Sequence, residues 1–403
     1  MPLLLGIAAG LLLGLVGLWA FGRWPRFERR PSSEELRDSR RNAIVRAVER
    51  ARPSVVTIRV HGRQRIAKPQ EELLWFPLAP GQQRDSERVG SGFFIDASGY
   101  ILTNEHVVRG AERILISIGD ATHGMSVQAR LVGAAPQFDL ALLQVPSIEP
   151  LRVGDALGAG APAIVPLDPG DSDELMVGEW VIAIGSPFGQ ELGILEPSVS
   201  VGVVSAVERD LPAATPGLGP SPYLKMIETD AAIHAGNSGG PLLDANGRVV
   251  GVNTVSFGTE GSGTSGIHFA IPINTARWVW QELLEYGEVR KPWIGWSVAD
   301  IAPEVSEAIQ LPEDQGIVTV TQVVPTSPAD QAGIRAGDVL LSLQGSEPYS
   351  RTRAERILFG TPVDANVTVD FFRDGQMHRT VVHVIEDPYT RAERERRAHP
   401  TPG

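Results

Sequence analysis

The chain has 403 residues, of which 42% are hydrophobic and 6% aromatic, with 43 glycines and a formal net charge of −12. This length allows two or three domains, and many glycines with few aromatic residues are typical of a β-rich globular protein. The acidic balance and the lack of a phosphate-binding loop or basic stripe argue against nucleic acid as a partner. Without cysteine there is no disulfide, thiolate metal site or cysteine nucleophile. We expect no metal or other cofactor.

The N-terminal segment is apolar. Residues 3–21 carry no charge and have about the length that crosses a bilayer. We therefore expect a transmembrane anchor over residues 1–23 and a charged linker over residues 24–42. A cleaved signal peptide is the alternative, but no basic residue precedes the apolar stretch and its cleavage site is poor. Arginines follow the stretch from Arg23 onward, which by the positive-inside rule would place the rest of the chain in the cytoplasm.

Residues 43–284 have the pattern of a first large domain. Helical spacing continues to Ala51 and stops at Pro53, and β-branched residues then predict a strand over 54–60. A polar insertion over 63–88 contains an apolar patch at 73–76, which we interpret as a subunit contact, a lid or a local cluster. Two series of strands predict one barrel each, and a helix closes the domain. The strands lie over 91–95, 100–102 and 114–118, then over 180–184, 199–207, 225–229, 242–243, 249–255 and 267–271, and the helix over 274–286.

Three segments carry the residues of a nucleophilic site. Ser238 stands in Gly-Asn-Ser-Gly-Gly, His106 in Thr-Asn-Glu-His-Val-Val, and Asp139 in Phe-Asp-Leu-Ala-Leu-Leu. A serine hydroxyl needs a base and a set of N–H donors to act as a nucleophile. The chain order His, Asp, Ser is that of the chymotrypsin double β-barrel. We predict a serine protease triad at the barrel junction, with the N–H groups of Gly236, Asn237 and Ser238 as the oxyanion hole.

A second domain is expected over residues 285–388. Its most informative segment is 327–341, which predicts a short helix, two glycine turns and a strand. Residues 389–403 alternate Arg and Glu and are expected to form a polar, solvated tail.

These motifs resemble the HtrA/Deg-type trypsin-like serine proteases over about residues 43–384. The resemblance includes the three segments above and Ala-Ile-Gly-Ser-Pro-Phe-Gly at 183–189. The second domain resembles a PDZ domain, with Ile294, Gly295 and Trp296 in the position of the family's carboxylate-binding loop. One anchor, one protease domain and one PDZ domain most resemble the membrane-anchored DegS-type branch.

The resemblance implies a mostly β protein: a chymotrypsin-like double β-barrel followed by one PDZ domain, with an N-terminal transmembrane helix. It implies a serine endopeptidase of protein quality control or stress signalling, anchored in the inner membrane with its catalytic body in the periplasm. Its expected partners are unfolded or regulatory protein substrates, C-terminal peptides at the PDZ domain, and two further copies in a homotrimer. The alternatives are a peptide-sensing scaffold and a chaperone with a latent protease.

Two histidines depart from the family pattern. His234 stands where relatives more often carry Asn, beside the oxyanion loop, and we interpret it as a pH-sensitive element or as a locally hydrogen-bonded substitution. His268 replaces what is usually a glycine in the strand over 267–271, so its effect on substrate binding is open. His61 and His123 are expected at the surface.

Overall fold

The structure is a computed structural model that describes residues 40–65, 83–118, 125–145, 165–186, 197–209, 225–234, 236–257, 266–301, 318–348 and 350–398. The expected anchor, most of the linker and the apolar patch at 73–76 lie outside these ranges. Within them, no helix combines the length and the apolar character needed to cross a bilayer. The same ranges contain no group of three or more His, Asp or Glu residues that could hold a metal ion. The first described helix is α3 (Ala43–Ala51), and the short turn η1 (Arg52–Ser54) follows it at Pro53.

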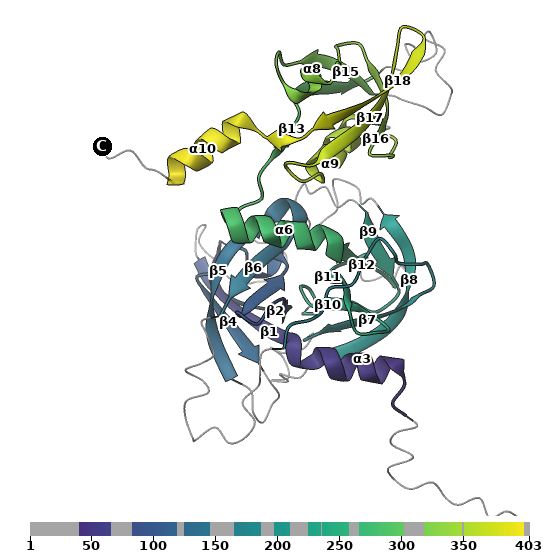
Figure 1. Cartoon of the computed structure of the whole chain (residues 1–403). Helices are drawn as coiled ribbons and strands as arrows, with labels where there is room; N and C mark the ends of the chain where they lie inside the picture. The colour runs from purple at the N-terminus through teal and green to yellow at the C-terminus, as the bar shows by residue number, and fades with distance from the viewer. Residues whose placement is uncertain are drawn as a thin grey trace, which may run out of the picture. The chain divides into compact units, whose positions relative to one another are not determined.

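Six antiparallel strands form a first closed barrel (Figure 1). Alternate residues point inward, so that Ile58, Ile116 and Leu143 are fully buried in its core. The four strands expected in this half are confirmed, and the structure adds two. In one of them small residues and Gly133 obscure the alternation, and the other is a short continuous apolar run that periodicity alone does not assign. The strands are β1 (Val55–Arg65), β2 (Gln83–Phe94), β3 (Tyr100–Thr103), β4 (Arg113–Ile118), the unexpected β5 (Met125–Ala135) and β6 (Leu140–Gln144), bonded in the order β1-β2-β3-β6-β5-β4. β1 and β2 also pair inside the segment expected to be an insertion.

The second half of the domain repeats the architecture. Its six antiparallel strands close in the order β10-β11-β12-β9-β8-β7 around Val181, Leu242 and Ala270. All six strands expected here are confirmed. They are β7 (Trp180–Gly185), β8 (Ser198–Arg209), β9 (Met226–Thr229), β10 (Pro241–Asp244), β11 (Val249–Phe257) and β12 (Ile267–Pro272).

Helix α6 (Ile273–Tyr286) packs against both barrels, as Figure 1 shows. It contacts β5 and β6 of the first barrel and β11 and β12 of the second. Gly287 ends the helix in a left-handed conformation with a φ of 74°. A Cβ atom on Gly133 of β5 would lie 2.4 Å from the Gly287 carbonyl oxygen. The contact between β5 and the end of α6 therefore requires a glycine at position 133.

A five-stranded antiparallel sheet with its own hydrophobic core forms the C-terminal unit. The expected short helix, glycine turns at Gly333 and Gly337, and following strand are confirmed as α8 (Pro328–Gln331) and β16. The strand order is β14 (Trp296–Asp300), β15 (Val318–Val323), β16 (Val339–Leu343), β17 (Asn366–Arg373) and β18 (Gln376–His383), with α9 (Arg351–Phe359) beside β14. A two-stranded ladder joins β13 (Pro292–Trp293) to β19 (Ile385–Glu386). The polar tail begins as a helix, α10 (Pro388–Ala398).

The packing of α6 on β5 predicts that Gly133→Ala lowers the thermal unfolding midpoint of the barrel domain. The added methyl group meets a backbone carbonyl, which cannot rotate away, and we expect a loss of about 2–3 kcal/mol. Gly170→Ala is the matched control, because its Cβ would lie 3.2 Å from the nearest atom, also a backbone carbonyl oxygen, which has to shift by only a few tenths of an ångström. Calorimetry measures both midpoints. A Gly133→Ala protein as stable as the control would contradict the close contact.

Candidate active site

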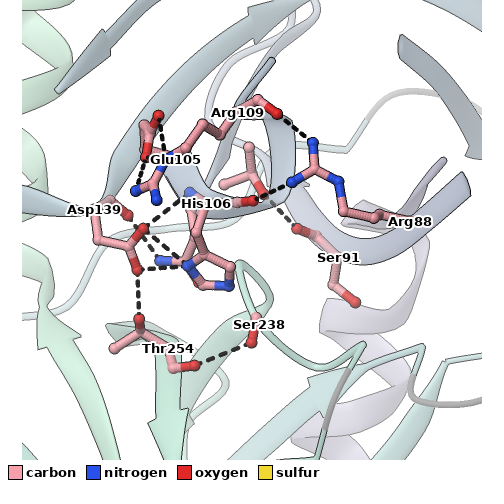
Figure 2. A network of polar contacts seen from close by, with 10 residues as sticks. Arg88, Ser91, Glu105, His106, Arg109, Asp139, Ser238 and Thr254 are labelled. Carbon is pink, nitrogen blue, oxygen red and sulfur yellow. Dashed lines mark hydrogen bonds and ion pairs between the residues drawn. The ribbon is translucent and has the colours of Figure 1, made fainter. Parts of the chain in front are cut away.

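His106 lies on α4 (Glu105–Val108), a single helical turn that follows β3. The adjacent Glu105 is buried and accepts hydrogen bonds from Arg109 Nε at 2.8 Å and Nη2 at 2.5 Å. Arg88 of β2 donates to the carbonyl oxygens of His106 and Arg109. These contacts attach the short helix to the first barrel and fix the position of the imidazole (Figure 2).

Asp139 follows the turn η2 (Pro136–Phe138) with a left-handed φ of 50°, and it is 1% exposed. Its carboxylate lies 2.8 and 2.9 Å from His106 Nδ1 and also accepts the His106 backbone N–H over 3.0 Å. From β11 of the second barrel, the Thr254 hydroxyl donates to the same carboxylate over 2.6 Å. An ionised carboxylate can only accept, so His106 Nδ1 carries the proton and Nε2 of the neutral ring is an acceptor.

Ser238 reaches the same network through Thr254. Its Oγ donates to the Thr254 carbonyl oxygen over 3.0 Å. Figure 2 shows the Ser238 side chain on the side of the site where the imidazole of His106 lies. The fold therefore brings together the three residues predicted from the sequence, with Thr254 in contact with both the aspartate and the serine.

Ser91 of β2 holds the loop that carries Ser238. Its backbone N–H donates to the Ser238 carbonyl oxygen over 2.9 Å, and its hydroxyl donates to the Gly236 carbonyl oxygen over 2.6 Å. The Ser91 hydroxyl also accepts the Ser186 N–H over 2.9 Å. A residue of the first barrel thus holds the carbonyl groups on either side of Asn237, in a loop of the second barrel.

Glycines shape the backbone on both sides of Ser238. Gly236 has a φ of 99° at the third position of a turn in which the Asn237 N–H donates to the His234 carbonyl oxygen over 2.9 Å. Gly239 has a φ of 84°, and a Cβ atom there would lie 2.3 Å from the Ser91 carbonyl oxygen. Only glycine fits this conformation and this close approach.

The hydrogen bonds of this turn revise the expected oxyanion hole. The Asn237 N–H is committed to His234, so we remove Asn237 from the candidate donors. The Asn237 carbonyl accepts the Gly240 N–H over 3.0 Å, and a trans peptide directs its carbonyl and its N–H in opposite directions. The Ser238 N–H therefore points away from Gly240. Among the described residues, neither the Gly236 nor the Ser238 N–H has a backbone acceptor, and both remain candidates.

The other histidines occupy different settings. His234 is exposed, and its carbonyl belongs to the turn before Ser238. His268 on β12 is 9% exposed. His61 on β1 is exposed, as expected, and His123 lies outside the described residues.

The expected carboxylate-binding loop joins β13 to β14. The carbonyl of Ile294 accepts the Ala329 N–H over 2.9 Å, and that of Gly295 accepts the Val324 N–H over 2.7 Å. Because each trans peptide directs its N–H away from its carbonyl, the N–H groups of Gly295 and Trp296 point away from these contacts. They lie at the N-terminal end of β14, an edge strand of the sheet.

Thr254 and Ser91 are not among the residues predicted from the sequence. Each is a hydroxyl residue inside a strand of one barrel and acts on a loop or a carboxylate of the other, so its role depends on how the barrels meet. The signal that could have found Thr254 is a polar pair, with Asn253, inside an otherwise apolar strand. Ser91 has no comparable signal.

Comparison with known proteins gives the family. Residues 90–252 match the model of the trypsin-like peptidase domain, and residues 293–384 match that of the PDZ domain. A probable periplasmic serine endoprotease DegP-like from Marinomonas sp. (strain MWYL1) is 35% identical over 350 residues, which cover 82% of this chain and 68% of that protein. A protein of the same name from Ectopseudomonas mendocina (strain ymp) is 38% identical over 304 residues, 75% of this chain. The chain spans 58% of the length of that relative.

A solved structure agrees with these matches. The HtrA-type protease AlgW with a decapeptide has a TM-score of 0.58 and 32% sequence identity to this chain, over 85% of this chain and 98% of that one. The two domain matches fall on the double barrel and on the five-stranded sheet described above. The chain belongs to the HtrA family of trypsin-like serine proteases that carry a PDZ domain.

Proposed function

We propose that the protein is a serine endopeptidase that cleaves unfolded or regulatory proteins, with His106, Asp139 and Ser238 as its catalytic residues. The observation that carries this proposal is the Asp139 carboxylate, which accepts hydrogen bonds from His106 and Thr254 while the Thr254 carbonyl accepts one from Ser238. A single buried carboxylate thus orients the base and holds the strand that contacts the nucleophile. The names of the relatives, periplasmic serine endoproteases, support the same activity.

In the proposed acylation step, Ser238 Oγ first rotates from the Thr254 carbonyl toward Nε2 of His106. Nε2 takes the hydroxyl proton as Oγ attacks the scissile carbonyl carbon, and Asp139 stabilises the imidazolium through Nδ1–H. The N–H groups of Gly236 and Ser238 stabilise the oxyanion. The imidazolium then protonates the leaving amine, and a water molecule hydrolyses the acyl-enzyme by the same proton transfers.

We further propose that C-terminal peptides bind to the PDZ domain and regulate proteolysis. An extended peptide can add a strand to the open edge of β14. The N–H groups of Gly295 and Trp296 would receive its terminal carboxylate. The solved structure of AlgW with a decapeptide supports peptide binding in this family.

Residues 1–23 would anchor the protein in the inner membrane with its catalytic body in the periplasm. The uncharged stretch 3–21 supports a single membrane pass, and the names of the periplasmic relatives support the location of the body. The arginines after the stretch favour the opposite orientation, so the location rests on the relatives. Assembly as a homotrimer is proposed from the family resemblance.

Replacing the nucleophile tests the activity. Ser238→Ala removes the hydroxyl that forms the acyl-enzyme, so cleavage of unfolded casein should fall by about 10³-fold or more. The release of labelled peptides measures the loss. Cleavage that persists in the variant would contradict the assignment. A wild-type protein that prevents aggregation but never cleaves, with or without C-terminal peptides, would instead favour the chaperone or scaffold.

Thr254→Val tests the link between the barrels. The substitution keeps the shape of the side chain and removes its hydrogen bond to Asp139, a bond to a charged group worth about 1.5–3 kcal/mol. We expect kcat to fall roughly 10- to 100-fold with little change in KM, since the hydroxyl orients Asp139 rather than the substrate.

The control for this variant is Thr361→Val, which removes another buried hydroxyl whose bond is to a backbone carbonyl of the C-terminal unit. Steady-state kinetics on one peptide substrate compare the three proteins. A Thr254→Val enzyme with an unchanged kcat would show that Thr254 has no part in positioning the aspartate.

The PDZ proposal predicts that a peptide with a free C-terminal carboxylate binds and that its C-terminal amide does not. Amidation removes the charge that the loop N–H groups receive, so we expect about tenfold or greater loss of affinity. Fluorescence anisotropy measures binding, and casein cleavage measures the effect on the protease. Equal affinity of acid and amide would refute carboxylate capture.

A further inference from the structure

His268 is a buried histidine that the proposed mechanism does not use. It lies on β12, is 9% exposed, and its Nδ1 has no hydrogen-bond partner among the described residues. Buried polar atoms are nearly always paired, and an unpaired one costs about 1–3 kcal/mol. The unpaired Nδ1 of His268 belongs to a strand that pairs with the one contacting the catalytic serine. A bound substrate could therefore supply its hydrogen-bond partner.

The register of β12 places His268 close to the strand that contacts Ser238. It lies directly opposite Ser256 on β11, two residues beyond Thr254, whose carbonyl accepts the Ser238 hydroxyl. On its other side His268 lies opposite Thr229 of β9. The Thr229 hydroxyl donates its only proton to a backbone carbonyl and accepts one N–H, so it has no proton to donate to an imidazole nitrogen.

His268 also faces the segment that leads to the nucleophile. Asp230 and His234 of this segment interact electrostatically with the imidazole, and the His234 carbonyl closes the turn just before Ser238. His268 therefore lies between two walls: β11 beyond Thr254 on one side, and on the other the end of β9, from which residues 230–234 lead to the turn before Ser238.

A bound peptide would direct one side chain between these walls. When Ser238 rotates toward His106, the Thr254 carbonyl becomes available to accept the N–H of the residue whose carbonyl is attacked, the P1 residue. Its side chain then extends along β11 toward the position opposite Ser256, which His268 occupies. The imidazole is larger than the glycine usual in this family, so it shortens the space for that side chain.

The charge of His268 at neutral pH follows from its surroundings. Burial and the nearby His234 hold the pKa of His268 below its ordinary value, against the opposing effect of Asp230. The ring is therefore mainly neutral near pH 7. A neutral ring nitrogen pairs with a hydroxyl in either tautomer, since a hydroxyl both donates and accepts.

We propose that His268 is a specificity-determining residue that lines the P1 subsite and selects a short, neutral P1 side chain carrying a hydroxyl, as in Thr or Ser. This inference rests on the proposed protease function and adds the substrate class. Thr satisfies the buried nitrogen, whereas Val has the same shape and leaves it unpaired. A subsite that contains an unpaired buried nitrogen disfavours Val, because Val has the shape of Thr but lacks the hydroxyl that would pair with the nitrogen.

The test compares peptides that differ only at P1. Wild-type full-length protein is first incubated with a proteome-derived peptide library, with a mixture of C-terminal peptides as activators, and cleavage sites are read by mass spectrometry. The best site is then synthesised with Thr, Val or Leu at P1, and kcat/KM is measured for each. We expect wild type to favour Thr over Val by about tenfold or more.

Two variants separate the hydrogen bond from the size of the side chain. His268→Phe keeps a ring and removes the nitrogens, so the Thr-to-Val ratio should fall to about one. His268→Gly should also lose the preference and should cleave the Leu peptide faster, because the subsite deepens. His61→Phe, an exposed histidine of the first barrel, is the matched control and should keep the wild-type ratio.

The outcomes distinguish this inference from the function on which it rests. Cleavage by wild type with a preference for Val, or an unchanged ratio in both His268 variants, would overturn the role of His268 and leave the protease assignment intact. Absence of any cleavage above the Ser238→Ala background would overturn both.

Discussion

The Asp139 carboxylate is the interaction on which the rest of the site depends. It is almost fully buried and accepts hydrogen bonds from the backbone and imidazole of His106 and from Thr254 of the other barrel. A buried charge is tolerated only when such partners satisfy it. The catalytic chemistry therefore depends on the fold, because the carboxylate has all its hydrogen-bond partners only when both barrels are formed and packed together. Only then is the imidazole held in the tautomer that can accept a proton from Ser238.

A second set of contacts fixes the nucleophile loop. Ser91 binds the carbonyls of Gly236 and Ser238 from the first barrel, and Gly239 fits against Ser91 because it has no side chain. The loop is thereby fixed before the serine at Gly236, at the serine itself and after it at Gly239. His234, the first residue of the turn that leads to these anchors, is exposed.

Much of this arrangement is predictable from the sequence, because its signals are local. The strands of the second barrel, the closing helix and the three catalytic candidates follow from apolar runs and short motifs. β5 escapes prediction because small residues obscure its alternation and Gly133 serves the close contact with α6. β6 escapes because a short continuous apolar run has no periodicity to read. Thr254 and Ser91 escape because their partners lie far away in the chain. Asn237 is wrongly expected as an oxyanion donor because the sequence does not show that its N–H closes the turn with His234.

Reaction with a fluorophosphonate tests the central claim most directly, since such a probe bonds only to an activated serine. Labelling with and without C-terminal peptides, followed by peptide mapping, should place the phosphonyl group on Ser238, and His106→Ala should slow labelling by roughly 100-fold or more. Labelling of another residue, or an unchanged rate in the His106→Ala protein, would contradict the account in which Asp139 and His106 activate Ser238.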